Sequence, residues 1–247
     1  MFTDSHAHLT DPAFHDDIDA VLQRAEEAGV TTILNICTGE EPLRRGLELK
    51  RRYPWIHNIA ATTPHDADEA DPFFSMVAQA DLVAIGETGL DYYYEHSPKE
   101  KQRALFCRYL TLALERDLPV VIHCREAFDD FFAIIDEMAV KRGVLHCFTG
   151  TLRDAEKLME RGWYLSLSGI LTFNKSGPLR EVAREMPTGR LLIETDAPYL
   201  APQGFRGKRC EPAHVVRVAE ELAKVKGLSL QEIAHQTTAN VKALFRI

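Results

Sequence analysis

Short apolar runs and amphipathic stretches alternate along almost the whole chain. The apolar runs are bounded by polar residues, which is typical of buried strands in a parallel sheet. We expect strands at residues 2–9, 31–37, 56–63, 82–87, 119–124, 143–148, 163–169 and 190–195. Apolar residues at helical spacing predict helices at residues 18–28, 41–53, 73–80, 98–118, 128–142, 152–161 and 177–185, and two more at the end of the chain.

About eight strands that alternate with helices indicate an α/β protein built from βαβ units. A doubly wound open sheet would show the same alternation, but no glycine-rich phosphate loop follows any of the strands. The length of 247 residues is typical of a (β/α)8 TIM barrel. No linker or repeat divides the chain, so we expect a single domain over residues 1–247.

Composition narrows the setting in which the protein works. No apolar stretch reaches the length of a membrane span, and no secretory leader is visible at the start. Five cysteines without a CxxC pair suit a reduced, cytoplasmic protein. The net charge of −8 means that a polyanionic substrate would need local positive charge or metal ions to hold it.

Polar side chains with metal-binding capacity stand where the predicted strands end. In a TIM barrel these carboxyl ends meet at the rim that carries the active site. The side chains are His6, His8, Glu87, His123, His146 and Asp196. A single histidine at a strand end is usually a satisfied structural group, but six metal-capable groups on one rim predict a metal centre.

Six ligands exceed what one catalytic ion takes, which favours two divalent ions. We expect His6, His8 and Asp196 to hold one ion, and His123 and His146 to hold the other, with Glu87 bridging them. Mg²⁺ or Mn²⁺ suits an oxygen-rich substrate, and the four histidines also suit Zn²⁺. Cys124 and Cys147 each follow a ligand histidine, and strand alternation predicts that they pack against the surrounding helices.

The motifs DSHAHL, GETGLDYYY, VIHCREA, HCFTG and ETDAPYLAP…RGKRCEPAHV together resemble the TatD family of metal-dependent deoxyribonucleases. The resemblance extends over the whole chain and implies a TIM barrel of the amidohydrolase-like superfamily. It also implies 3′–5′ exonuclease action on single-stranded DNA or RNA and the ligand set given above. Two positions depart from the family pattern: Thr63 stands before Pro64 where histidine is common, and Cys210 stands before Glu211 where asparagine is common.

Several further residues are candidates for binding a nucleic acid. Arg125 is expected to clamp a phosphate, and the cationic run Arg206, Lys208 and Arg209 to add positive charge. Bases could stack on Tyr92, Tyr93 and Phe148, although aromatic residues in such loops more often pack internally. Glu194 and Asp4 are expected to support metal ligands from behind.

These features predict a divalent-metal-dependent phosphodiesterase that acts as a 3′–5′ exonuclease on single-stranded nucleic acid, as a monomer. A water activated by the two ions would attack phosphorus, with Asp196 as ligand and proton acceptor and Glu87 as the bridging group. Two alternatives stay open from the sequence. The same metal pair could cleave an ester or amide, as in a D-aminoacyl-tRNA deacylase, or the chain could be a metal-binding module without turnover.

Overall fold

The computed structural model describes residues 1–67 and 71–247. The strands of the described residues are Phe2–Ala7 (β1), Val30–Cys37 (β2), Ile56–Ala60 (β3), Ala84–Asp91 (β4), Val120–Arg125 (β5), Gly143–Leu145 (β6), Tyr164–Leu167 (β7) and Leu191–Ile193 (β8). The α-helices are Ile18–Glu27 (α1), Glu40–Arg52 (α2), Phe73–Gln79 (α3), Lys99–Glu115 (α4), Phe128–Glu137 (α5), Leu152–Glu160 (α6), Gly177–Glu185 (α7), Val215–Lys226 (α8) and Leu230–Phe245 (α9). Short 3-10 helices lie at Pro12–Phe14, Pro64–Asp66, Gly169–Thr172, Thr188–Arg190 and Pro212–His214.

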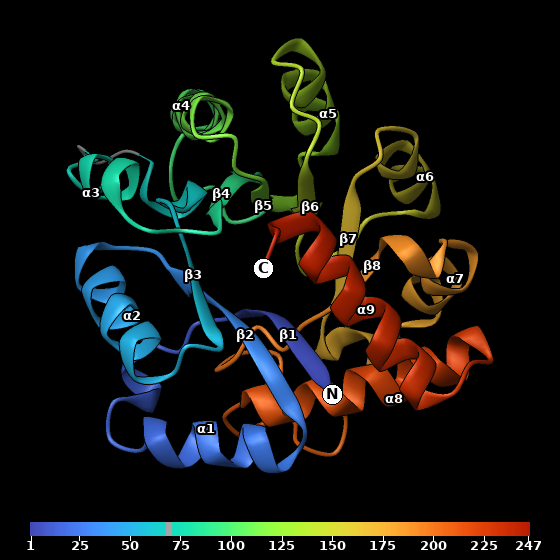
Figure 1. Cartoon of the computed structure of the whole chain (residues 1–247). Coiled ribbons are helices and arrows are strands. Elements are labelled where there is room, and N and C mark those ends of the chain that lie inside the picture. Colours follow the sequence, from blue (N-terminus) through green and yellow to red (C-terminus); the bar gives the residue numbers. More distant parts are fainter. Residues whose placement is uncertain (68–70) are drawn as a thin grey trace.

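The eight strands of the described residues form one parallel sheet in sequence order, and helices surround it (Figure 1). The sheet curls into a barrel because the chain beyond β8 hydrogen-bonds to β1. The amide of Asp196 donates to the carbonyl of His6 at 2.9 Å, and the amide of His8 donates to the carbonyl of Ala197 at 2.7 Å. The predicted (β/α)8 TIM barrel is therefore confirmed.

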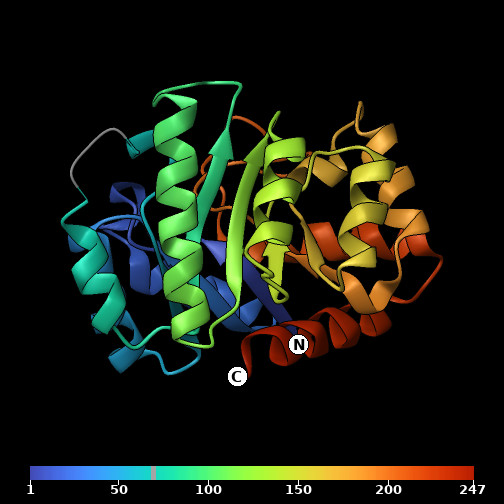
Figure 2. The ribbon, with the colours of Figure 1, turned by 90° about the horizontal axis from the view of Figure 1, so that it is seen from above.

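Two apolar clusters hold the barrel together. The larger cluster lies between the strands and the surrounding helices. The smaller one fills the barrel interior with strand residues such as Leu34, Val121 and Leu192, which pack with Leu244 and Phe245 of α9. Helix α9 crosses one end of the barrel, and β4 and β5 point away from it (Figure 2). The carboxyl ends of the strands are thus left for the polar site.

Some element boundaries differ from those expected. Helix α5 ends at Glu137 instead of residue 142, because Ala139 adopts a left-handed φ of 54° that a helix cannot continue. Strand β4 runs past Glu87 to Asp91, because residues 88–91 pair in register with β5 after a shift between Ile85 and Thr88. No helix among the described residues combines the length and apolar composition that a bilayer-spanning segment needs.

Candidate metal centre

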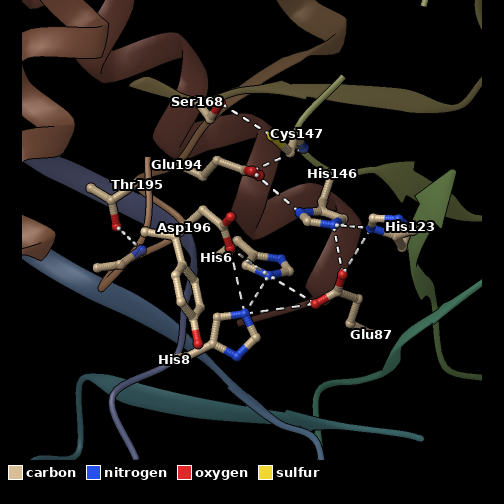
Figure 3. A network of polar contacts seen from close by, with 12 residues as sticks. His6, His8, Glu87, His123, His146, Cys147, Ser168, Glu194, Thr195 and Asp196 are labelled. Atoms are coloured by element: carbon tan, nitrogen blue, oxygen red, sulfur yellow. Dashed lines mark hydrogen bonds and ion pairs between the residues drawn. The ribbon is translucent and has the colours of Figure 1, made fainter. Parts of the chain in front are cut away.

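The structure brings all six predicted ligands together at the carboxyl end of the barrel (Figure 3). They come from strands or strand ends spread over the sequence. His6 and His8 belong to β1 and the residue after it, Glu87 to β4, His123 to β5, and His146 and Asp196 follow β6 and β8. A cavity of about 790 Å³ opens over them, and every one except His6 lines it. The rule that strand ends converge therefore placed these side chains correctly.

Glu87 stands between two pairs of imidazoles. Its Oε2 atom lies 3.4 Å from Nε2 of His6 and 3.7 Å from Nε2 of His8. Its Oε1 atom lies 2.8 Å from Nε2 of His146 and 3.2 Å from Nδ1 of His123. Each carboxylate oxygen thus faces a different pair, which is the arrangement that a bridging ligand needs.

Asp196 completes the first of these groups. Its Oδ1 atom lies 3.4 Å from Nε2 of His8 and 3.5 Å from Nε2 of His6. Potential ligand atoms of Asp196, His6 and His146 also lie within 4.8 Å of one another, close enough to bind one cation together. Asp196 therefore lies close to His6, His8 and His146, and its assignment to the ion held by His6 and His8 stays a prediction.

The chemistry of the donor set suits divalent cations. Nε2 of His6 lies 3.3 Å from Nε2 of His8, and Nε2 of His146 lies 3.4 Å from Nδ1 of His123. At such distances each pair of ring nitrogens can share at most one proton. The carboxylates of Glu87 and Asp196 point toward the spaces between these nitrogens. Imidazole nitrogens and carboxylate oxygens are ligands that Zn²⁺ and Mn²⁺ accept, so the residues present fit a metal centre.

The electrostatics of these side chains point the same way. Burial opposes a charge on His146, but the carboxylates of Glu87 and Glu194 outweigh it and raise the pKa of His146 well above its ordinary value. Burial also opposes ionisation of Glu87, yet His146 and His123 hold the pKa of Glu87 well below its usual range. The pKa of His6, by contrast, is lowered by its burial and by the nearby His146. Ionised carboxylates thus lie beside imidazoles such as His146 that bind a proton strongly, and a cation would take the place of such a proton.

Two further carboxylates orient the histidine ligands from behind. Oε1 of Glu194 lies at an ion-pair distance of 3.4 Å from Nδ1 of His146, without a hydrogen bond to it, and accepts the amide of Cys147 at 2.9 Å. Oδ2 of Asp91 accepts from Nε2 of His123 at 2.8 Å. Such partners fix the tautomer and orientation of a metal-binding imidazole. The sequence analysis missed Asp91, although an acidic residue in a buried strand was a signal that could have found it.

Asp4 supports the site in a different way from that expected. It is fully buried and accepts the hydroxyl of Thr195 at 2.5 Å and the amide of Thr195 at 3.0 Å. It also accepts the amide of His6 at 3.3 Å. Burial raises the pKa of Asp4 to about 8. Asp4 therefore fixes the backbone where β1 meets the end of β8.

Three predictions about loop side chains are wrong. Phe148 is 1 % exposed and packs against Phe128, so no base can stack on it. Arg209 makes a bidentate ion pair with Asp17, at 2.8 and 2.7 Å, and a further bond to Glu211, so its charge is already used. Cys147 lines the cavity instead of packing outward, because it follows the end of β6 with a left-handed φ of 43° and strand alternation does not reach it.

Other candidates lie away from the cavity or stay predictions. Tyr92 donates its hydroxyl to Asp130 at 2.6 Å and does not line the cavity. Arg206 and Lys208 also lie outside the cavity wall, and Arg206 stacks on Phe173 at 4.4 Å. Cys124 packs in the core, as expected, and also contributes to the cavity wall.

The two departures from the family pattern occupy different surroundings. Thr63 lines the cavity, whereas Cys210 is buried away from it. The sequence also passed over Tyr94 and Tyr199, which line the cavity, and gave no role to His65, which lines it just past Pro64. The tyrosines of the cavity wall are therefore different from the aromatic residues that the sequence indicated.

Comparisons with known proteins agree with this architecture. The family model described as TatD related DNase matches residues 3–246. The chain is 39% identical over its full length to the uncharacterized metal-dependent hydrolase YabD of Bacillus subtilis, all of which is covered. It is 36% identical to the 3′-5′ ssDNA/RNA exonuclease TatD of Citrobacter rodentium, over 99% of this chain and 97% of that protein.

A solved structure supports the same conclusion. The crystal structure of the TatD homolog YJJV from Escherichia coli superposes with a TM-score of 0.94 at 31% identity, covering 100% of this chain and 98% of the other. The family model names a DNase, and the curated relative YabD is named a metal-dependent hydrolase. The chain belongs to the TatD related DNase family and is a metal-dependent hydrolase.

Proposed function

We propose that this hydrolase is a 3′–5′ exonuclease of single-stranded DNA or RNA that works with two divalent ions. The observation that carries the proposal is the position of Glu87, whose two oxygens face separate pairs of imidazoles. A relative named as a 3′-5′ ssDNA/RNA exonuclease shares 36% identity with the chain and supports the substrate class and polarity.

The residues divide the work among themselves. His6, His8 and Asp196 would hold one ion, His123 and His146 the other, and Glu87 would contact both. Two bound ions would supply an acidified water and neutralise charge on the phosphoryl group. Asp196 remains ionised, because its histidine neighbours outweigh its burial and lower its pKa, so its carboxylate is ready to accept a proton from the attacking water.

The cavity above these residues suits a strand end. Its volume of about 790 Å³ falls in the usual range for sites that enclose a small ligand, about 300–1,000 Å³. Aromatic side chains on its walls, Tyr94 and Tyr199, offer faces or edges to an unpaired base. A flexible single strand can place its terminal nucleotide there, whereas a stiff duplex would first have to unpair.

Digestion of labelled DNA tests this function. A single strand labelled at its 5′ end should shorten stepwise in Mg²⁺ or Mn²⁺, and a blunt duplex of the same sequence should shorten more slowly. EDTA should stop the reaction, and Glu87→Ala should abolish it, while Glu115→Ala on the exposed outer face of α4 serves as the matched control.

Three results would contradict the proposal. Rapid cutting of a circular single strand would show an endonuclease, because a circle has no end. Loss of the 5′ label as the first product would reverse the polarity. Release of amino acids from aminoacyl-tRNA by a protein that leaves all oligonucleotides intact would show an ester hydrolase in place of a nuclease.

A further inference from the structure

Arg125 is an arginine at the cavity over the candidate metal centre, and no carboxylate in the described part of the chain pairs with it. It ends β5, two residues after His123, and lines the cavity. Among the residues that the structure describes, its guanidinium has no ion pair and no hydrogen bond. Other arginines of this acidic chain, such as Arg24, Arg161 and Arg209, pair with carboxylates. A half-buried guanidinium with all of its donors free is suited to bind an anion from outside.

Two tyrosines fix the position of this guanidinium. Its central carbon lies 4.0 Å from the ring centre of Tyr93 and 4.7 Å from that of Tyr94. The two rings meet nearly at right angles, at 84°, so they support the guanidinium from two directions. The amides of both tyrosines donate to Asp91, which ties the pair to the carboxylate behind His123. Stacking on aromatic rings leaves the N–H edges of an arginine available for oxygen atoms.

Arg125 also stands where two cavities meet. A second cavity of about 590 Å³ lies over the starts of α5, α6 and α7, and Arg125 and Thr149 line both. A chain that leaves the metal centre on this side passes Arg125 before it enters the second cavity. Alternate residues of a strand point to the same face, so Arg125 and His123 both turn toward the cavity that they line.

The second cavity itself does not suit a phosphate. Three carboxylates line it, those of Glu126, Asp154 and Glu181, and Arg125 at its edge is its only cationic lining residue among those described. These carboxylates repel phosphate but accept hydrogen bonds from amino and hydroxyl groups of a nucleoside. The charges of the lining residues therefore favour an anion at Arg125 and an uncharged, hydrogen-bonding group in the second cavity.

We propose that Arg125 binds the phosphate on the 5′ side of the scissile phosphodiester, so that the enzyme distinguishes a polynucleotide end from a phosphodiester without a neighbouring charge. Tyr93 and Tyr94 are positioning residues for this contact. The inference rests on the proposed exonuclease function. It adds a subsite, separate from the metal ligands, that binds a retained strand only if that strand has a charged phosphate next to the scissile one.

Two trinucleotides of equal length test the subsite. One is the thymidine trimer with two natural phosphodiesters, and the other carries a neutral methylphosphonate at the linkage nearer its 5′ end. The measured quantity is the ratio of kcat/KM for release of the 3′ nucleotide from the two substrates. A charge-assisted contact predicts a ratio of about 10 for the wild-type protein. The ratio should fall to about 1 in Arg125→Met and take an intermediate value in Arg125→Lys.

Matched variants separate this role from a general effect on the fold. Arg190 also packs on a tyrosine, at 4.9 Å from the ring centre of Tyr164, but it precedes β8 at the opposite end of the barrel. Arg190→Met should keep the wild-type ratio, whereas Tyr93→Leu with Tyr94→Leu should lower it. Metal content and thermal unfolding of each variant show whether the site is intact.

The outcomes are distinct. Equal cleavage of both trimers by the wild type, or the same ratio in Arg125→Met as in the wild type, would overturn the subsite and leave the exonuclease function standing. Failure of the wild type to release a nucleotide from either trimer in Mg²⁺ or Mn²⁺ would overturn the proposed function and the subsite together.

Discussion

Asp91→Asn is the substitution that tests most directly whether His123 is held ready for a metal ion. In the wild type, Oδ2 of Asp91 accepts from Nε2 of His123 at 2.8 Å, which leaves Nδ1 of the ring facing Glu87. Oδ1 of Asp91 accepts the amides of Tyr93 and Tyr94 at 3.0 and 2.8 Å. Both carboxylate oxygens therefore act as acceptors.

An asparagine cannot satisfy both sides, because it has one acceptor oxygen and one NH₂ donor. If its oxygen faces His123, its NH₂ group opposes two backbone N–H donors. If it turns round, the NH₂ group opposes Nε2–H of His123, and the ring must change tautomer and place a proton on Nδ1. Loss of such a supporting carboxylate typically weakens metal binding 10- to 100-fold, or by about 1.4–2.8 kcal/mol.

Calorimetric titration of metal-free protein with Mn²⁺ measures the effect. One of the two binding steps should weaken by about this factor in Asp91→Asn, and the other should change little, because His6, His8 and Asp196 keep their geometry. Asp130→Asn is the control, since Asp130 also accepts from a tyrosine but does not line the cavity. Two steps of wild-type affinity in Asp91→Asn would refute the role given to this carboxylate.

Further predictions concern the ligands, protons and packing. Glu87→Ala should lower the metal content at saturation from two ions to less than one, and full occupancy by metal analysis would remove the bridging assignment. The pKa values of His123 and His146 are raised, so Mn²⁺ must displace protons near neutral pH. The affinity for Mn²⁺ should therefore increase as the pH rises through these pKa values. Equal calorimetric heats of Mn²⁺ binding in buffers of different ionisation enthalpy would argue against this proton release. EDTA should lower Tm by roughly 5–10 °C relative to protein at 100 times the metal Kd, a shift that differential scanning calorimetry would detect. A Cβ on Gly46 would lie 2.7 Å from Oδ1 of Asn58, so Gly46→Ala should cost about 1–2 kcal/mol in urea unfolding, and unchanged stability would show that α2 can shift.

The sequence was sufficient to predict which metal-capable side chains meet at the rim, because barrel topology alone determines where strand ends lie. Once a run such as residues 119–124 is recognised as a parallel strand, the rim position of His123 follows without any knowledge of side-chain packing. The same reasoning applies to His146 and Asp196, each of which comes a few residues after a short buried strand. His6 and Asp196, which are 190 positions apart in the sequence, could thus be assigned to one site.

The loop side chains could not be predicted in this way. Phe148 and Tyr94 both follow ligand-bearing strands, yet one is buried and the other lines the cavity. The difference depends on neighbours that come from elsewhere in the chain, such as Phe128 beneath Phe148. Arg209 shows the same limitation, because its partner Asp17 lies 192 residues away and leaves no local signal.

The seam between β1 and the chain after β8 has a consequence for how the protein is made. His6 and His8 are synthesised first, but Asp196 can join them only when most of the chain has been made. His123 and His146, by contrast, come from the successive units β5 and β6, with His146 directly after β6. Closing so long a loop is entropically unfavourable until both ends are anchored. An ion held by His6, His8 and Asp196 would then bind last and stabilise the closed barrel. A ribosome-bound fragment that ends before Asp196 could bind a metal ion at His123 and His146. It could not form the seam that closes the barrel.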